Sequence, residues 1–209
     1  MRKWLYCILL TAMVLPMVSC RRAVEKARRN IRLEAEQMRT LVEQMLTLAR
    51  ADNGVRPAAM EPLNLSDVAT DCVLAFEPVA FEAGHVLDYD IAPSLPVRGD
   101  GAKLGQALAV LLDNAVKYAA PGTPIRLTAV RQGSRAVVSV TDQGPDIPSD
   151  KLPRIFDRFY RVDKARSRES GGTGLGLSIA KEIIRQHEGK LLLVDRPGPG
   201  TTLRMELKR

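Results

Sequence analysis

Residues 171–180 read Gly-Gly-Thr-Gly-Leu-Gly-Leu-Ser-Ile-Ala, a glycine-rich loop that runs directly into a helical pattern predicted over residues 174–186. Closely spaced glycines let backbone N–H groups approach a phosphate, and a helix N-terminus adds partial positive charge. No strand immediately precedes the loop, which excludes a Rossmann fingerprint, and it lacks the Gly-Lys-Ser/Thr ending of a Walker A loop. The pattern predicts a phosphate-binding loop of another kind, and a plain glycine-rich hinge is the alternative.

A second motif lies upstream on a helix predicted over residues 101–119. Asn114, Lys117 and Tyr118 are three and four positions apart, so they share one face of that helix. The opposite stripe is apolar and is predicted to be buried; it consists of Leu108, Leu111, Leu112 and Ala115. An amide, an ammonium and an aromatic ring on one face can hold a metal–phosphate group and an adenine. A solvated polar face is the alternative.

Between these motifs, a strand predicted over residues 136–141 delivers Asp142 into a turn with Gly144. A carboxylate at that place can accept a hydrogen bond from an adenine amino group, although ordinary strand-end turns look the same. The next segment is rich in aromatic and arginine side chains, at Phe156, Phe159, Tyr160 and Arg161. It predicts a lid over a nucleotide, and packing of the two phenylalanines into the core is the alternative.

The remaining pattern predicts an α+β fold. Helices are expected over residues 66–83, 148–156 and the two ranges given above, with Ser66-Asp67 and Asp100 as N-caps. Strands are expected over residues 86–91, 125–130, 136–141, 191–194 and 201–207. This mixture predicts a two-layer α/β sandwich in which helices cover one face of the sheet.

Composition excludes several classes of protein. The chain has 209 residues, of which 45% are hydrophobic and 26% charged, and these ordinary values exclude collagen, low-complexity and wholly disordered chains. Cys7, Cys20 and Cys72 are too widely spaced for a disulfide framework or a zinc site, and two histidines are too few for most histidine metal sites.

The net charge of +7 sits almost wholly at the N-terminus, because residues 1–51 carry +6 and residues 52–209 carry +1. A basic appendage on a neutral domain favours a membrane-adjacent segment, and we expect no nucleic-acid partner. Residues 4–19 are uncharged, with more Lys and Arg after them than before, which predicts that most of the chain is cytoplasmic. A short membrane anchor, a cleaved signal or lipoprotein leader ending at Cys20, and a misassigned gene start all remain open.

Residues 27–51 contain no glycine or proline and are rich in helix-forming residues. Apolar residues recur there at steps of four and three, at Ile31, Ala35, Met38, Val42, Met45 and Ala49. Such a heptad seam needs a partner helix, as in a four-helix bundle, although packing on the chain's own domain is the alternative. Asp52-Asn-Gly ends the helix, and two prolines follow in the predicted linker over residues 53–63.

Taken together, in this order and spacing, the motifs over residues 62–208 resemble the ATP-binding catalytic domain of sensor histidine kinases of two-component systems, a fold shared with gyrase-type ATPases. The N box is matched by Asn114, the G1 box by Asp142 and Gly144, the F box by Phe156, Phe159 and Tyr160, the G2 box by Gly172, Gly174 and Gly176, and the last glycine element by Gly200-Thr201. Residues 34–52 resemble the second helix of the family's dimerisation domain.

The resemblance implies four parts: a hydrophobic segment (1–20), a partial dimerisation helix (21–52), the linker (53–63) and the ATP-binding catalytic domain (64–209). It implies that ATP with Mg²⁺ binds under a lid, and that the γ-phosphoryl passes to a histidine and then to a response regulator. Asn114 would hold Mg²⁺, Lys117 a phosphate, Tyr118 the adenine face and Asp142 its amino group. The implied nucleotide-binding set is Asn114, Lys117, Tyr118, Asp142, Gly144, Phe159, Arg161, Gly172, Thr173, Gly174, Leu175, Gly176 and Thr201. A homodimer at the inner (cytoplasmic) membrane is expected.

The sequence departs from the family pattern at three places. It contains no His-Glu-Leu-Arg-Thr-Pro-like acceptor segment, and His85 and His187 lie outside the bundle helix, so no catalytic phosphoacceptor is predicted. Val110 stands where the family usually has a polar residue, and Asp146 replaces the second glycine of the G1 box. A carboxylate there should crowd the turn and repel phosphates, so we expect nucleotide binding to be retained but weakened.

These departures leave three functions open. The first is a kinase, read from a shortened or rearranged gene, that phosphorylates a histidine-bearing dimerisation helix of itself or of another kinase in trans. The second is a catalytically defective nucleotide-binding module that regulates a kinase partner. The third is phosphotransfer to serine, as in related anti-sigma kinases, against which the dimerisation-like helix argues.

Overall fold

The structure is a computed structural model that describes residues 24–49 except 33, 37 and 47, together with residues 60–162, 173–194 and 198–209. The chain divides into two compact units, Met1–Met45 and Leu46–Arg209. The hydrophobic segment (1–20), most of the linker (53–63) and part of the lid lie outside the described residues. No described helix is long and apolar enough to cross a membrane.

In the N-terminal unit the chain is helical over residues 24–45 wherever it is described, and this confirms that part of the helix predicted from residue 27. The apolar residues of the predicted heptad seam are exposed, among them Ile31, Met38 and Val42. An apolar seam at this spacing is the kind of surface that a helix presents to a partner helix.

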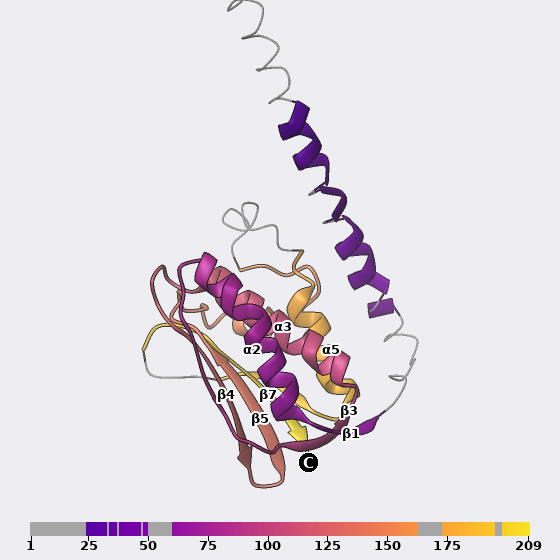
Figure 1. Cartoon of the computed structure of the whole chain (residues 1–209), viewed down its shortest axis with the longest axis vertical. Helices are drawn as coiled ribbons and strands as arrows, with labels where there is room; N and C mark the ends of the chain where they lie inside the picture. The colour runs from indigo at the N-terminus through magenta and orange to yellow at the C-terminus, as the bar shows by residue number, and fades with distance from the viewer. Residues whose placement is uncertain are drawn as a thin grey trace, which may run out of the picture. The chain divides into compact units, whose positions relative to one another are not determined.

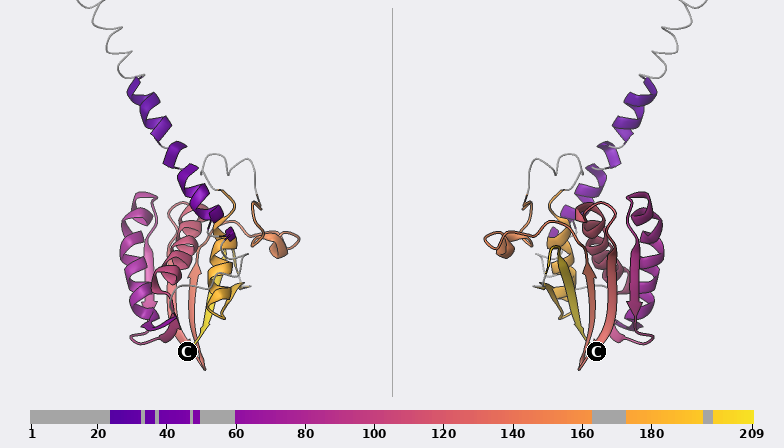
Figure 2. Two further views of the ribbon diagram at one scale, coloured as in Figure 1. Left: turned by 90° about the vertical axis from the view of Figure 1, so that its right-hand side faces the viewer. Right: turned by 90° about the vertical axis from the view of Figure 1, so that its left-hand side faces the viewer.

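A five-stranded sheet organises the second unit, in the order β2 (Leu87–Ile91), β4 (Ile125–Gln132), β5 (Arg135–Thr141), β7 (Thr202–Lys208) and β6 (Lys190–Leu193). The β2–β4 pair is parallel and the other three pairs are antiparallel. One face of the sheet is covered by α2 (Leu65–Glu82), α3 (Gly101–Tyr118) and α5 (Gly176–Gln186), as Figures 1 and 2 show. The predicted α+β two-layer sandwich is therefore confirmed.

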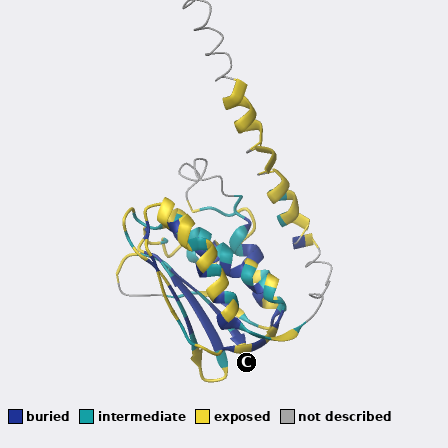
Figure 3. Cartoon of the chain, in the orientation of Figure 1, coloured by how far each residue is buried: buried dark blue, intermediate teal, exposed yellow. Residues whose placement is uncertain are grey.

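The core forms where the sheet meets these helices (Figure 3). On β4, buried Ile125, Leu127 and Ala129 alternate with more exposed residues, as a strand covered on one face requires. On α3 the buried stripe is Leu104, Ala107, Leu108, Leu111, Leu112 and Ala115. This includes all four residues predicted to face the core, and it turns the opposite face of α3 away from the sheet.

A second, two-stranded sheet was not predicted. β1 (Glu61–Asn64) pairs antiparallel with β3 (Pro96–Gly99), so the last residues assigned to the linker are strand. Each strand has only four residues and contains a proline, which cannot donate to a ladder. A pattern this short carries no periodic signal, and its partner lies more than thirty residues away in the chain.

Two local predictions are corrected by the structure. The N-cap of α2 is Asn64 rather than Ser66-Asp67: Asn64 Oδ1 accepts the Ser66 N–H (3.3 Å) and the Leu95 N–H (2.9 Å). Ser66 is instead buried and donates its hydroxyl to the Ala92 carbonyl. The helix predicted over residues 148–156 is only one 3₁₀ turn, η1 (Leu152–Arg154), because Pro148 at the start of that stretch and Pro153 within it remove backbone donors.

Both histidines of the chain are part of the folded framework, and each is only 6% exposed. His187 Nε2 accepts the N–H of Asp100, the predicted N-cap of α3, at 3.0 Å, while its Nδ1 donates to the Ile183 carbonyl at 2.7 Å. His85 Nδ1 donates to the Thr123 carbonyl at 3.0 Å. The His187 ring therefore joins the end of α5 to the start of α3, which Asp100 caps through the Lys103 N–H.

We predict that His187→Ala destabilises the protein by about 1–3 kcal/mol, because the buried imidazole is lost and the part-buried Asp100 N–H loses its acceptor. Urea denaturation followed by circular dichroism measures this change. Lys190→Ala, which truncates an exposed side chain on β6, is the matched control and should leave the midpoint within error. Equal midpoints for both variants would show that the ring does not hold the two helices together.

Candidate functional site

Four segments that are distant in sequence meet at one end of the second unit: the end of α3, the turn after β5, the turn before β7 and the N-terminus of α5. Backbone groups make most of these contacts. Asp142 donates its N–H to the Thr201 carbonyl at 2.9 Å, which joins the turn after β5 to the turn before β7. The predicted residues of these four segments therefore come together although their motifs span almost ninety residues.

Asp142 is fixed and almost fully buried, with 6% exposure. Its Oδ1 accepts the N–H of Gly144 at 2.7 Å, so the carboxylate closes its own turn. This is the local hydrogen bond that makes aspartate common in turns. It holds the carboxylate in one orientation, as recognition of a ligand donor requires.

Gly144 lets this turn lie directly against the end of α3. A Cβ at this position would overlap the carbonyl oxygen of Tyr118 and lie 2.8 Å from Asp142 Oδ1. Only glycine allows such an approach without a shift of the backbone. The contact places the Asp142 turn against the backbone of Tyr118, the last residue of α3, whose side chain is partly exposed.

On the exposed side of α3 the predicted polar face is present, but part of it is engaged within the helix. Asn114 Nδ2 donates to the Val110 carbonyl at 2.9 Å. Lys117 Nζ forms an ion pair with Asp113 Oδ2 at 2.6 Å. The sequence reasoning missed Asp113, although the four-residue spacing of an acid and a lysine signals such a pair. Its carboxylate partly neutralises the ammonium that was assigned to phosphate.

The N-terminus of α5 offers backbone donors. Its N-cap residue, Leu175, is buried and has no side chain that could accept from the first turn. Thr173 Oγ1 accepts the Leu175 N–H at 3.3 Å and orders the approach to the helix. The N–H groups of the first turn have no acceptor inside the helix, which suits an anion. A Cβ on Gly176 would lie 3.2 Å from Val110 Cγ1, so this end of α5 packs closely on α3.

The loop before α5 also contacts the aromatic segment. Phe159 donates its N–H to the Gly174 carbonyl at 2.9 Å, and Gly174 has a φ of +72°, where a Cβ would lie 3.0 Å from the Phe159 backbone. Phe159 itself adopts a φ of +61° and its side chain is 60% exposed. A non-glycine residue in this region is disfavoured by about 1–2 kcal/mol, so tertiary contacts hold the conformation. Arg161 is half-buried, and Gly172 lies outside the described residues.

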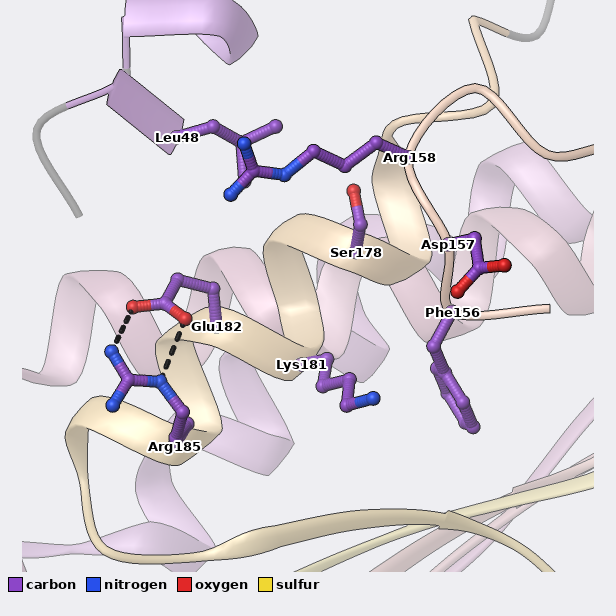
Figure 4. Close-up of a pocket in the computed structure, with 8 residues that line it drawn as sticks. All are labelled: Leu48, Phe156, Asp157, Arg158, Ser178, Lys181, Glu182 and Arg185. Carbon is purple, nitrogen blue, oxygen red and sulfur yellow. Dashed lines mark hydrogen bonds and ion pairs between the residues drawn. The ribbon is translucent and has the colours of Figure 1, made fainter. Parts of the chain in front are cut away.

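A pocket of about 470 Å³ lies elsewhere, along the face of α5 that points away from the core (Figure 4). Its lining residues are Leu48, Phe156, Asp157, Arg158, Ser178, Lys181, Glu182 and Arg185. Glu182 binds Arg185 through two hydrogen bonds of 2.7 and 2.8 Å, and these raise the pKa of the guanidinium. Lys181 Nζ lies 5.3 Å from the centre of the Phe156 ring. None of the residues predicted to bind nucleotide lines this pocket, so it is a separate surface.

Comparison with known proteins identifies relatives of this chain. The family profile of histidine kinase-, DNA gyrase B- and HSP90-like ATPases matches residues 99–209. Sensor histidine kinase YkoH of Bacillus subtilis (strain 168) is 37% identical over 183 residues, which are 88% of this chain and 39% of YkoH. The chain thus spans about two-fifths of that curated relative.

Solved structures agree with this result. The histidine kinase AdeS of Acinetobacter baumannii has a TM-score of 0.67 at 25% identity, over 83% of this chain and 79% of that one. Full-length ShkA in complex with AMPPNP has a TM-score of 0.69 at 26% identity, over 80% of this chain and 35% of that one.

We predict that Gly144→Ala destabilises the protein and loosens the turn that holds Asp142, because the new Cβ collides with the Tyr118 carbonyl. Thermal unfolding and amide hydrogen exchange at residues 141–146 measure both effects. Gly105→Ala is the matched control: its Cβ would meet only ordinary contacts at 3.7 and 3.9 Å. Within α3 that change should be neutral or stabilise by up to about 1 kcal/mol. If Gly144→Ala behaves like the control, the close approach does not constrain the site.

Proposed function

This chain belongs to the family of histidine kinase-, DNA gyrase B- and HSP90-like ATPases, and from that premise we propose that it binds ATP with Mg²⁺ and acts as the catalytic portion of a sensor histidine kinase. The observation that carries the proposal is the meeting of the buried Asp142 turn, the end of α3 and the uncapped N-terminus of α5. Named sensor histidine kinases among its relatives support the same reaction class.

Each part of this site fits a different part of the nucleotide. Asp142 would accept from the adenine amino group, and the side chain of Tyr118 would lie along the adenine. The first-turn N–H groups of α5, with Thr173 and Gly174 before them, would receive phosphate oxygens. Thr201 lies beside Asp142 and would border the base. Phe159 and Arg161 would cover the nucleotide from the segment that contacts Gly174.

Asn114 suits Mg²⁺ because magnesium takes oxygen ligands and is usually held by one or two protein groups together with substrate phosphates. The Asn114 amide nitrogen is engaged by Val110, so the carboxamide is oriented by its own helix. When bound, ATP–Mg²⁺ supplies the phosphoryl group and neutralises its charge. The residues of the chain would position that group, and positioning is the protein's main contribution to catalysis of phosphoryl transfer. Lys117 would contribute less positive charge than a free lysine, because Asp113 pairs with it.

The acceptor histidine would come from outside these 209 residues. Both histidines of the chain are buried and hydrogen-bonded within the fold. Phosphorylating either ring would therefore require local unfolding. We infer that a histidine-bearing dimerisation helix supplied in trans receives the phosphoryl group, and that a response regulator takes it in turn. The exposed seam of Ile31, Met38 and Val42 suits the bundle in which such a helix would lie.

The hydrophobic segment over residues 1–20 would hold this assembly at the cytoplasmic membrane, with the ATP-binding domain in the cytoplasm. What supports this placement is the charge pattern, since the Lys and Arg residues that follow the segment outnumber those before it.

We predict that Asp142→Asn raises the dissociation constant for ATP at least tenfold, about 1.4 kcal/mol. Oδ1 is engaged by the Gly144 N–H, so the amide NH₂ would take the other position and meet the adenine amino group donor to donor. GTP carries a carbonyl at that place, so the variant should also lose preference for ATP over GTP. Isothermal titration calorimetry measures both constants. Asp88→Asn, which changes an exposed carboxylate on β2, is the control.

We also predict that the chain alone, incubated with γ-labelled ATP and Mg²⁺, gains no acid-labile label. Adding a separately purified kinase dimerisation domain with its acceptor histidine should give acid-labile label on that domain. Label on His85 or His187 of the folded chain would contradict the proposal. Absence of label on several dimerisation domains, despite tight ATP binding, would favour the second function below.

A catalytically defective nucleotide-binding module is the second candidate, and Val110 is the observation that favours it. Its apolar side chain packs against the N-terminus of α5, where the resembling kinases usually carry a polar residue. Such a module would bind ATP without turnover and would regulate a kinase partner. Co-purification with a kinase, together with ATP binding and no label transfer, would distinguish it from an active enzyme.

A further inference from the structure

Asp146 was expected to crowd its turn and repel a nucleotide, and the structure gives its carboxylate a different partner. Asp146 Oδ1 accepts the N–H of Gly200 at 2.9 Å, across 54 residues of sequence. The bond connects the turn of residues 142–146, which follows β5, with the turn of residues 198–200, which precedes β7. A hydrogen bond from an N–H to a charged carboxylate is stronger than one between neutral groups.

The same two turns touch at a second place. Asp142 donates its N–H to the Thr201 carbonyl, and a Cβ on Gly200 would overlap the carbonyl oxygen of Asp142. Gly200 has a φ of +113°, a conformation that side chains rarely adopt. The two backbones therefore lie in direct contact beside Asp142, and the Asp146 side chain closes the outer end of that contact.

We propose that Asp146 is a positioning residue for the adenine pocket: it fastens the 198–200 turn to the 142–146 turn before a nucleotide arrives. Asp142 and Thr201 are thereby held in their binding positions in the free protein. Ordering a turn in advance removes an entropy cost from the binding step. This inference rests on the proposed binding of ATP. Charge alone predicts that Asp146 weakens ATP binding, whereas the inference predicts that Asp146 strengthens it.

Four variants distinguish a role of Asp146 in holding the two turns together from repulsion between its charge and the nucleotide. Asp146→Asn removes the charge and keeps an acceptor oxygen, whereas Asp146→Ala and Asp146→Gly remove both. Asp150→Ala removes a neighbouring exposed carboxylate and is the control. If Asp146 fastens the turns, Ala and Gly weaken ATP binding about three- to tenfold, the range set by one net hydrogen bond. Asn restores most of the affinity and Asp150→Ala changes little.

A second measurement does not depend on ATP. In the full chain without nucleotide, amide hydrogen exchange of Gly200 should be faster in Asp146→Ala and close to wild type in Asp146→Asn. If the wild type fails to bind ATP, the proposed function fails, while the exchange rates still decide whether Asp146 holds the turn. Unchanged exchange in Asp146→Ala overturns the inference. So does tighter ATP binding in all three Asp146 variants, which is the outcome that charge repulsion requires.

Discussion

The candidate site depends on backbones that meet with no side chain between them. Gly144 lies against the Tyr118 carbonyl and Gly200 against the Asp142 carbonyl, so three segments share one small volume. These contacts bury the Asp142 carboxylate and direct it through the Gly144 N–H. A Cβ at either glycine would separate the segments, because polar backbone groups at this distance cannot be compressed. The arrangement of the other site residues follows from this constraint.

The two histidines also join segments that are distant in the sequence. His187 joins α5 to the N-cap of α3, and His85 binds the loop before β4 through Thr123. Both rings act as hydrogen-bonding groups inside the fold. Under the proposed function, the acceptor histidine would therefore be presented by another helix. The exposed heptad seam of residues 24–45 is suited to packing against such a helix.

Departures from the family pattern have structural partners. Asp146 replaces a glycine, yet its carboxylate bonds to Gly200. Val110 stands where the family usually has a polar residue. Its side chain packs on Gly176, and its carbonyl oxygen accepts a hydrogen bond from Asn114 Nδ2. Each substitution therefore changes what its neighbours can do, and a residue-by-residue transfer of roles from relatives would miss this.

Periodic patterns in the sequence were sufficient to predict α2, α3, α5 and all five strands of the main sheet, because apolar spacing reports directly which face is buried. The glycine loop, Asp142 and Asn114 indicated nucleotide chemistry for a different reason. Each belongs to a short motif whose residues are close together in the sequence. Only the tertiary structure decided the β1–β3 pair, the bond from the Leu95 N–H to Asn64, the bridge from His187 to Asp100 and the bond from Asp146 to Gly200. These join residues between 31 and 87 positions apart. No local pattern encodes such pairs, because they form only after the sheet and helices have packed.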